Sequence, residues 1–162
     1  MSSEQKLEIQ EDRDFQERFW KAERVAGAAF GLIILAGALG LLGSGGLFAR
    51  GSVKAGESGL EYPRVARWQT GERILVSFGP RATDERRVLL SRRFAESFTL
   101  EDAQPRPLRA ETSASGELLI FSVKAGETGE AALRVKPNSP GFIQAVLTID
   151  DDPASATIVV LP

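Results

Sequence analysis

The chain offers few side chains able to do chemistry, because it contains no histidine and no cysteine. Histidine is the usual general base near neutral pH, and both residues are the commonest ligands of zinc and other transition metals. Their absence excludes Ser-His-Asp sites, Cys-His sites and thiol redox centres. Carboxylates, hydroxyls, lysines and Tyr62 are left, and no spacing marks two acids as a converging pair. We therefore expect a protein that is not an enzyme and binds no cofactor.

One compact acidic cluster is present, Asp150-Asp151-Asp152. Carboxylate oxygens suit calcium, and a loop between strands is a plausible place for such a site. The run lacks the spaced ligands of a calcium loop, however, and it precedes Pro153 as a solvated turn does. We expect a turn here and no metal.

The densest basic patch flanks the sequence VLLS and consists of Arg86, Arg87, Arg92 and Arg93. Near a membrane these arginines could contact anionic headgroups or an acidic partner. Charges at the edge of a strand also discourage unwanted sheet pairing, and the sequence leaves both interpretations open. With a net charge of −2, the chain has no electrostatic signature of nucleic-acid binding.

No charged residue lies between Arg24 and Arg50. A helix over this stretch would reach about 36 Å at ~1.5 Å per residue, enough for the ~30 Å hydrocarbon core of a bilayer. A cleaved signal peptide would need a shorter, basic leader and a shorter apolar run. A buried helix would need other helices to pack against, and the rest of the chain reads as strands. The segment therefore predicts one transmembrane helix over residues 25–48.

The tail before it, residues 1–24, ends in aromatic and basic side chains suited to the membrane interface. It is either an interfacial amphipathic segment or an ordinary entry into the membrane. Only Arg50 and Lys54 follow the span closely, so the small basic bias places the tail in the cytoplasm and the C-terminal domain in a bacterial periplasm. The predicted interface residues are Phe15, Arg18, Phe19, Trp20, Lys21 and Arg24.

Small residues recur along the predicted span. Gly27 and Gly31 form a small-xxx-small pair, which allows another helix to approach closely. Ala36, Ala38 and Gly40 extend the small-residue surface. We expect this helix to pack on a multi-pass membrane protein or on a second copy of itself.

A polar, Gly-rich stretch over residues 49–59 predicts a linker, and residues 60–162 predict one β-domain. Alternating apolar residues and frequent breakers favour an antiparallel, Ig-like β-sandwich without a core disulfide. Trp68 is the expected core anchor. Residues 92–103 predict either a helical turn between the sheets or a strand. The expected strands are 60–68, 73–78, 86–91, 108–112, 117–123, 130–135, 142–149 and 157–161.

Four segments carry a resemblance to a known family: FQERFWKAERV, LEYPRVARW, SRRFAESFTLEDAQPRP and the terminal IVVLP. With these, the chain resembles a family of short bacterial single-pass inner-membrane proteins. The resemblance covers nearly the whole chain and implies a cytoplasmic tail, one span and a periplasmic β-domain. It implies no activity.

Together these features predict a non-catalytic accessory subunit. Its span would pack on a larger membrane protein, and its β-domain would dock on the outer face of that partner. The alternative is a self-associating or lipid-facing structural module without another protein partner.

Overall fold

The computed structural model describes residues 13–39 and 49–162. Helix α1 spans Arg13–Ala38, so it begins well before the predicted segment 25–48. Its start lies in the tail because Glu, Arg, Lys and Gln there are good helix formers. Residues 40–48 of the predicted span lie outside the described residues. In the described ranges, no helix combines the length and the apolar character needed to cross a bilayer.

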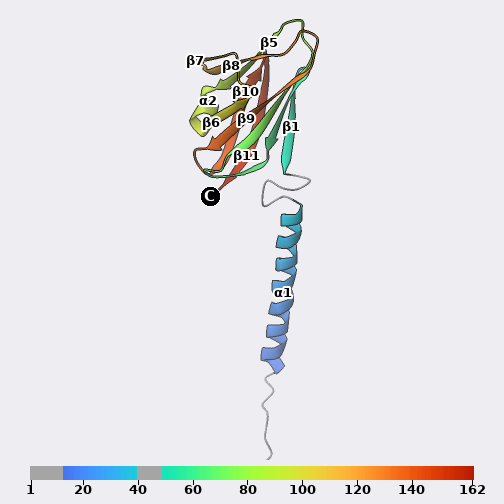
Figure 1. The fold of residues 1–162 in the computed structure, drawn as a ribbon. Coiled ribbons are helices and arrows are strands. Elements are labelled where there is room, and N and C mark those ends of the chain that lie inside the picture. The colour runs from blue at the N-terminus through green and yellow to red at the C-terminus, as the bar shows by residue number, and fades with distance from the viewer. Residues whose placement is uncertain (1–12, 40–48) are drawn as a thin grey trace, which may run out of the picture. The chain divides into compact units, whose positions relative to one another are not determined.

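The rest of the described chain forms a β-sandwich, as the sequence predicts (Figure 1). Neighbouring strands pair antiparallel, except that β3 runs parallel to β11. The first sheet has the order β1 (Arg50–Ala55), β2 (Ser58–Pro63), β4 (Glu72–Phe78), β9 (Gly129–Pro137) and β6 (Phe98–Gln104). The second has the order β3 (Val65–Arg67), β11 (Asp152–Leu161), β10 (Gly141–Ile149), β5 (Glu85–Ser91), β8 (Gly116–Ser122) and β7 (Arg109–Ser113).

The core lies between the two sheets and follows the predicted alternation. Apolar side chains at every second position of β9 and β10 are buried, which confirms the period-two pattern. Two pairs of phenylalanine rings pack within it, Phe78 with Phe121 at 5.9 Å and Phe94 with Phe98 at 5.1 Å between ring centroids. The sandwich therefore has an apolar core, and no disulfide links its sheets.

Two segments differ from their predicted form. Residues 50–55, inside the expected linker 49–59, form β1, which pairs with β2 along its whole length. Residues 92–103 contain both alternatives, since helix α2 (Arg92–Ser97) leads directly into β6. Ser91 caps α2 by accepting a hydrogen bond from the Phe94 N–H at 3.2 Å.

The expectation that Trp68 anchors the core is wrong, because its side chain is 44% exposed. Pro63 ends β2, and the chain crosses from the first sheet to the second before β3. Trp68 follows β3 directly and lies at the end of the sandwich. Its indole N–H donates to the Asn138 carbonyl at 3.2 Å.

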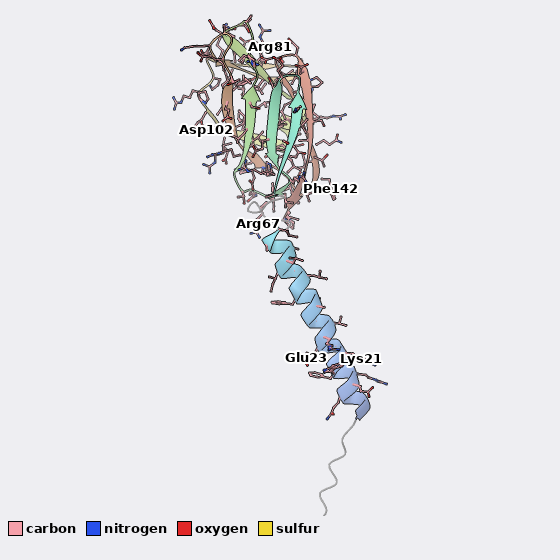
Figure 2. The ribbon with its side chains drawn as sticks, turned by 90° about the vertical axis from the view of Figure 1, so that its right-hand side faces the viewer. Lys21, Glu23, Arg67, Arg81, Asp102 and Phe142 are labelled. Carbon is pink, nitrogen blue, oxygen red and sulfur yellow. The ribbon has the colours of Figure 1, made fainter. Side chains whose placement is uncertain are left out.

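The sandwich has two distinct ends. We call the end where the chain enters at Ala49 the linker end, and the opposite one the far end. Figure 2 shows Arg67 and Phe142 toward the first and Arg81 at the second. The strand register agrees, since Val159 of β11 lies opposite both Val65 and Phe142.

Two glycines with positive φ provide a matched test of the fold. Gly116 (φ 140°) begins β8, and a Cβ there would meet the Leu90 carbonyl, whereas Gly126 (φ 79°) has open space. We expect Gly116→Ala to lower the free energy of unfolding by several times more than Gly126→Ala, which carries only backbone strain of about 1–2 kcal/mol. Urea unfolding measures both values, and equal losses would contradict the close approach of β8 to β5.

Candidate functional site

Arg86 is the most deeply buried charged residue of the domain. It shares the inward-facing side of β5 with Val88 and Leu90, and its side chain is 1% exposed. Its Nε donates to Asp150 Oδ2 at 3.0 Å, and its Nη2 donates to the same carboxylate and to Ser58 Oγ at 3.3 Å. Its Nη1 donates to the Gly79 carbonyl. Since Ser58 and Gly79 belong to the first sheet and its continuation, Arg86 joins the two sheets.

Asp150 completes this arrangement from the turn between β10 and β11. Its Oδ1 accepts a hydrogen bond from the Arg87 N–H at 3.0 Å. Burial raises the pKa of Asp150, but hydrogen bonds from Arg86 and the Arg87 N–H, with the charges of Arg86 and Arg81, outweigh burial and hold the pKa below its ordinary value. The carboxylate is therefore charged at neutral pH and serves as the counter-ion of Arg86.

A hollow of about 480 Å³ opens beside this ion pair at the far end. Arg81 lies across it, 3.7 Å from Asp150 and 3.5 Å from each of Asp151 and Asp152. Asp84 Oδ1 accepts from the Ala125 N–H at 2.7 Å. The hollow is lined by Arg81, Thr83, Asp84, Glu85, Arg87, Asp150 and Asp151.

Each acid that lines the hollow has a partner: the Ala125 N–H for Asp84, Arg109 for Glu85, Arg86 and Arg81 for Asp150, and Arg81 for Asp151. Within residues 13–39 and 49–162, no group of acids could hold a metal ion, and no buried side-chain nitrogen or oxygen lacks a hydrogen-bond partner. A general acid or base needs a free, positioned group, and the hollow presents paired ones. The acidic cluster Asp150-Asp151-Asp152 does form a turn, as predicted. Its first carboxylate, Asp150, is not solvated, however, because it is 8% exposed and pairs with Arg86.

The structure does not bring the four predicted arginines into one surface patch. Arg86 points into the core, whereas Arg87, Arg92 and Arg93 are exposed. Arg92 pairs with Glu96 at 3.2 Å along α2. Arg86 therefore cannot contact lipid or a partner as the sequence suggested, because its guanidinium is buried and hydrogen-bonded inside the sandwich.

The predicted interface residues lie on α1. Arg24 stacks over the Trp20 ring at 4.0 Å, a cation–π contact on the helix surface. Phe19 and Trp20 are 63% and 54% exposed. Arg18 and Lys21 are exposed as well, and the side chain of Phe15 lies outside the described residues.

The predicted packing residues also lie on α1, apart from Gly40, which is outside the described residues. A Cβ at Gly27 or at Gly31 would meet no atom within 4 Å, so this face is open. Ala36 is half-buried and Ala38 is exposed. The large apolar side chains beside them are 55–70% exposed: Val25, Phe30, Leu32, Ile33, Ile34 and Leu35.

No protein-family model matches the chain, and a search of the curated proteins finds no match either.

Sequence reasoning missed the Arg86–Asp150 pair. The sequence did contain a signal, because side chains alternate between the two faces of a strand. Arg86 is therefore on the same face of β5 as the apolar residues Val88 and Leu90. A charge on an apolar face needs a counter-ion, and acids in the turn before β11 could supply one. The exposed Arg87 beside it made the two arginines look like one surface patch.

A double-mutant cycle tests this pair. Removing one partner leaves a buried charge unpaired, so we expect Arg86→Met and Asp150→Asn each to lower the free energy of unfolding by about 3–5 kcal/mol. The double variant should lose less than the sum of the two, since neither charge is then left alone. Exposed Arg87→Met is the control, with an expected change within about 0.5 kcal/mol. Strict additivity in urea unfolding would contradict the coupling.

The pH dependence of stability gives an independent test. The pKa of Asp150 is lower in the folded chain than its value of about 3.9 in an unfolded one, so the unfolded state binds more protons between the two values. The stabilisation is complete above about pH 5 and is lost as the pH falls through the folded pKa. We expect the Asp150→Asn chain to lose less stability than the wild type between pH 6 and pH 3, measured by thermal unfolding. Parallel curves would contradict the assignment.

Proposed function

We propose that this chain is a membrane-anchored, non-catalytic accessory subunit. Its helix would pack on a larger membrane protein, and its β-sandwich would dock on the outer face of that partner. The observation that carries the proposal is the exposed apolar surface of α1. Side chains such as Phe30, Ile33 and Ile34 are stable only when lipid or protein covers them.

The uncharged sequence continues beyond α1 to Ala49, and this supports an anchor over residues 25–48. Arg18, Lys21 and Arg24 before it outnumber Arg50 and Lys54 after it. That bias favours a cytoplasmic tail and a β-domain in the periplasm, with the anchor in a bacterial inner membrane.

The open Gly27–Gly31 face supports a helix partner in the membrane. Without a hydrophobic driving force between helices in lipid, close backbone approach at small residues provides the packing contacts. The same face fits a second copy of α1, so self-association is the alternative function.

An uncharged region on the outer face of the second sheet, formed by β10 and β11, supports a docking side for the β-sandwich. Outward residues of β10 and β11 are uncharged, including Val146, Thr148, Ser155 and Thr157. Interface centres are depleted of charge, so this face suits contact with the outer domain of the larger membrane protein. The outer face of the first sheet carries charged residues instead: Arg73, Glu101, Asp102, Glu130, Arg134 and Lys136.

We also infer that the sandwich is Ig-like. In chain order, β2, β4, β6 and β9 match strands A, B, D and E of that fold, and β5, β10 and β11 match C, F and G. The sheet orders β2-β4-β9-β6 and β11-β10-β5 then reproduce the A-B-E-D and G-F-C arrangements. Strands β1, β3, β7 and β8 are additions to this pattern. Ig-like sandwiches serve many binding functions, which is compatible with a docking subunit.

Copurification from the membrane tests the proposed function. We expect gentle detergent extraction to recover the chain with a larger membrane protein in a fixed ratio, measured by mass spectrometry. A lone dimer would favour the self-associating alternative, and a monomer without partner would contradict both functions.

Substitutions on α1 test which face makes the contact. Gly27→Leu together with Gly31→Leu should reduce recovery of the partner about tenfold, or ~1.4 kcal/mol, because leucine side chains keep the helices apart. Ala29→Leu lies on the opposite face and is the matched control with unchanged recovery expected. Equal recovery with all three chains would rule out the glycine face.

A further inference from the structure

We propose that the linker end of the β-sandwich is a lipid-binding surface for anionic headgroups, formed by Arg64, Arg67, Trp68 and Phe142. We call these four residues the basal surface. The inference rests on the proposed membrane anchor and adds to it a second, peripheral contact with the same bilayer.

The linker end is the end of the domain at which the chain enters from the predicted anchor. Ala49 is 2% exposed, and its carbonyl accepts a hydrogen bond from the Arg64 N–H at 2.8 Å. Arg50 then begins β1. The predicted span ends at residue 48, so an anchor over residues 25–48 would be joined through the chain to the linker end and not to the far end.

Strand pairing gathers the basal surface at this end. Val65 lies opposite Val159 in the parallel β3–β11 pair, and Phe142 lies opposite Val159 on the other side. The backbone N–H of Trp68 donates to the Leu161 carbonyl at 2.7 Å. Figure 2 shows Arg67 and Phe142 toward the same end of the sandwich and Arg81 at the other.

The exposed side chains there suit a headgroup layer. Phe142 is 83% exposed, the highest value among the large apolar residues described as exposed, although it sits in a regular strand. Trp68 is 44% exposed while its indole N–H is bonded to Asn138, so the ring can lie against acyl chains without an unpaired donor. Aromatic side chains of this kind concentrate at membrane interfaces.

The charge of the basal surface is complementary to anionic lipid. Arg64 and Arg67 are exposed, and neither side chain takes part in a salt bridge within the described part of the chain. Glu61 and Glu72, on the neighbouring strands β2 and β4, have other partners than these two guanidinium groups. Glu61 pairs with Arg50 at 3.1 Å, and Glu72 accepts from the Arg67 backbone N–H beside Arg50. Two free guanidinium groups are thus available for phosphates, which arginine binds well.

The far end offers no such surface. There Arg81 is surrounded by Asp150, Asp151 and Asp152, so its charge is already neutralised. The two ends of the sandwich therefore differ, and among residues 49–162 only the linker end combines exposed aromatic rings with arginines outside any salt bridge.

Fluorescence of Trp68 in vesicles tests the proposal. Trp20 and Trp68 are the two tryptophans, so the full chain carrying Trp20→Phe reports on Trp68 alone. We would reconstitute it in phosphatidylcholine vesicles with or without phosphatidylglycerol, using lipids brominated near the headgroup as quenchers. Phosphatidylglycerol should increase quenching of Trp68 by about twofold or more, and added salt should reverse the increase.

Matched variants separate lipid contact from general effects of charge. In the same Trp20→Phe chain, Arg64→Gln with Arg67→Gln, or Phe142→Ser alone, should remove most of the increase. Arg87→Gln with Arg106→Gln removes two exposed arginines away from the linker end and should leave it unchanged. All of these positions are exposed, so unchanged thermal unfolding is expected and checks the fold.

Flotation of the vesicles after an alkaline wash distinguishes the two proposals. A chain that floats but shows no lipid-dependent quenching keeps the anchor and overturns the basal surface as a lipid site. Quenching that appears only after a membrane extract supplies protein would assign the surface to a protein partner and also overturn it. A chain that does not float overturns the anchor and the basal surface together.

Discussion

The architecture of the domain depends on one buried ion pair. Arg86 extends from the second sheet to Ser58 and Gly79 of the first while it binds Asp150 within its own sheet. Because the chain has no cysteine, no disulfide can link its two sheets. The Arg86 guanidinium links them by hydrogen bonds instead. Burying a charge pair contributes little net stability, because desolvation offsets attraction. Its hydrogen bonds to Ser58 and Gly79 of the first sheet instead favour one relative placement of the two sheets.

With its core closed and its buried polar groups satisfied, the sandwich leaves its binding capacity on its surfaces. The far end is occupied by Arg81 and its three aspartates. The outer face of β10 and β11 is uncharged, and the linker end holds aromatic rings with unpaired arginines. Helix α1 differs from the sandwich, because its leucine and isoleucine side chains have no described cover. We therefore propose that lipid and a protein partner cover helix α1, whereas the core of the β-domain is already closed.

Period-two alternation could be read directly from the sequence, so β9 and β10 and their buried residues are predicted correctly. Three features could not be read in the same way. Strand β1 (RGSVKA) has only Val53 as a large apolar residue, and it forms because β2 pairs with it. Trp68 looked like a core residue by size, yet Pro63 and the crossover carry it to the end of the sandwich. Arg86 is charged at an apolar position, and its partner lies 64 residues away in sequence.

The anchor at residues 25–48 is the central claim, and single-cysteine labelling tests it most directly. The chain has no native cysteine, so Ser3→Cys and Ala114→Cys each introduce one thiol, before α1 and in the exposed β7–β8 turn respectively. Intact cells would be treated with a membrane-impermeant maleimide and compared with lysed ones. We expect labelling of Ala114→Cys in intact cells and of Ser3→Cys only after lysis. Equal labelling of both positions before lysis, or of neither, would contradict a chain that spans the membrane with its β-domain outside.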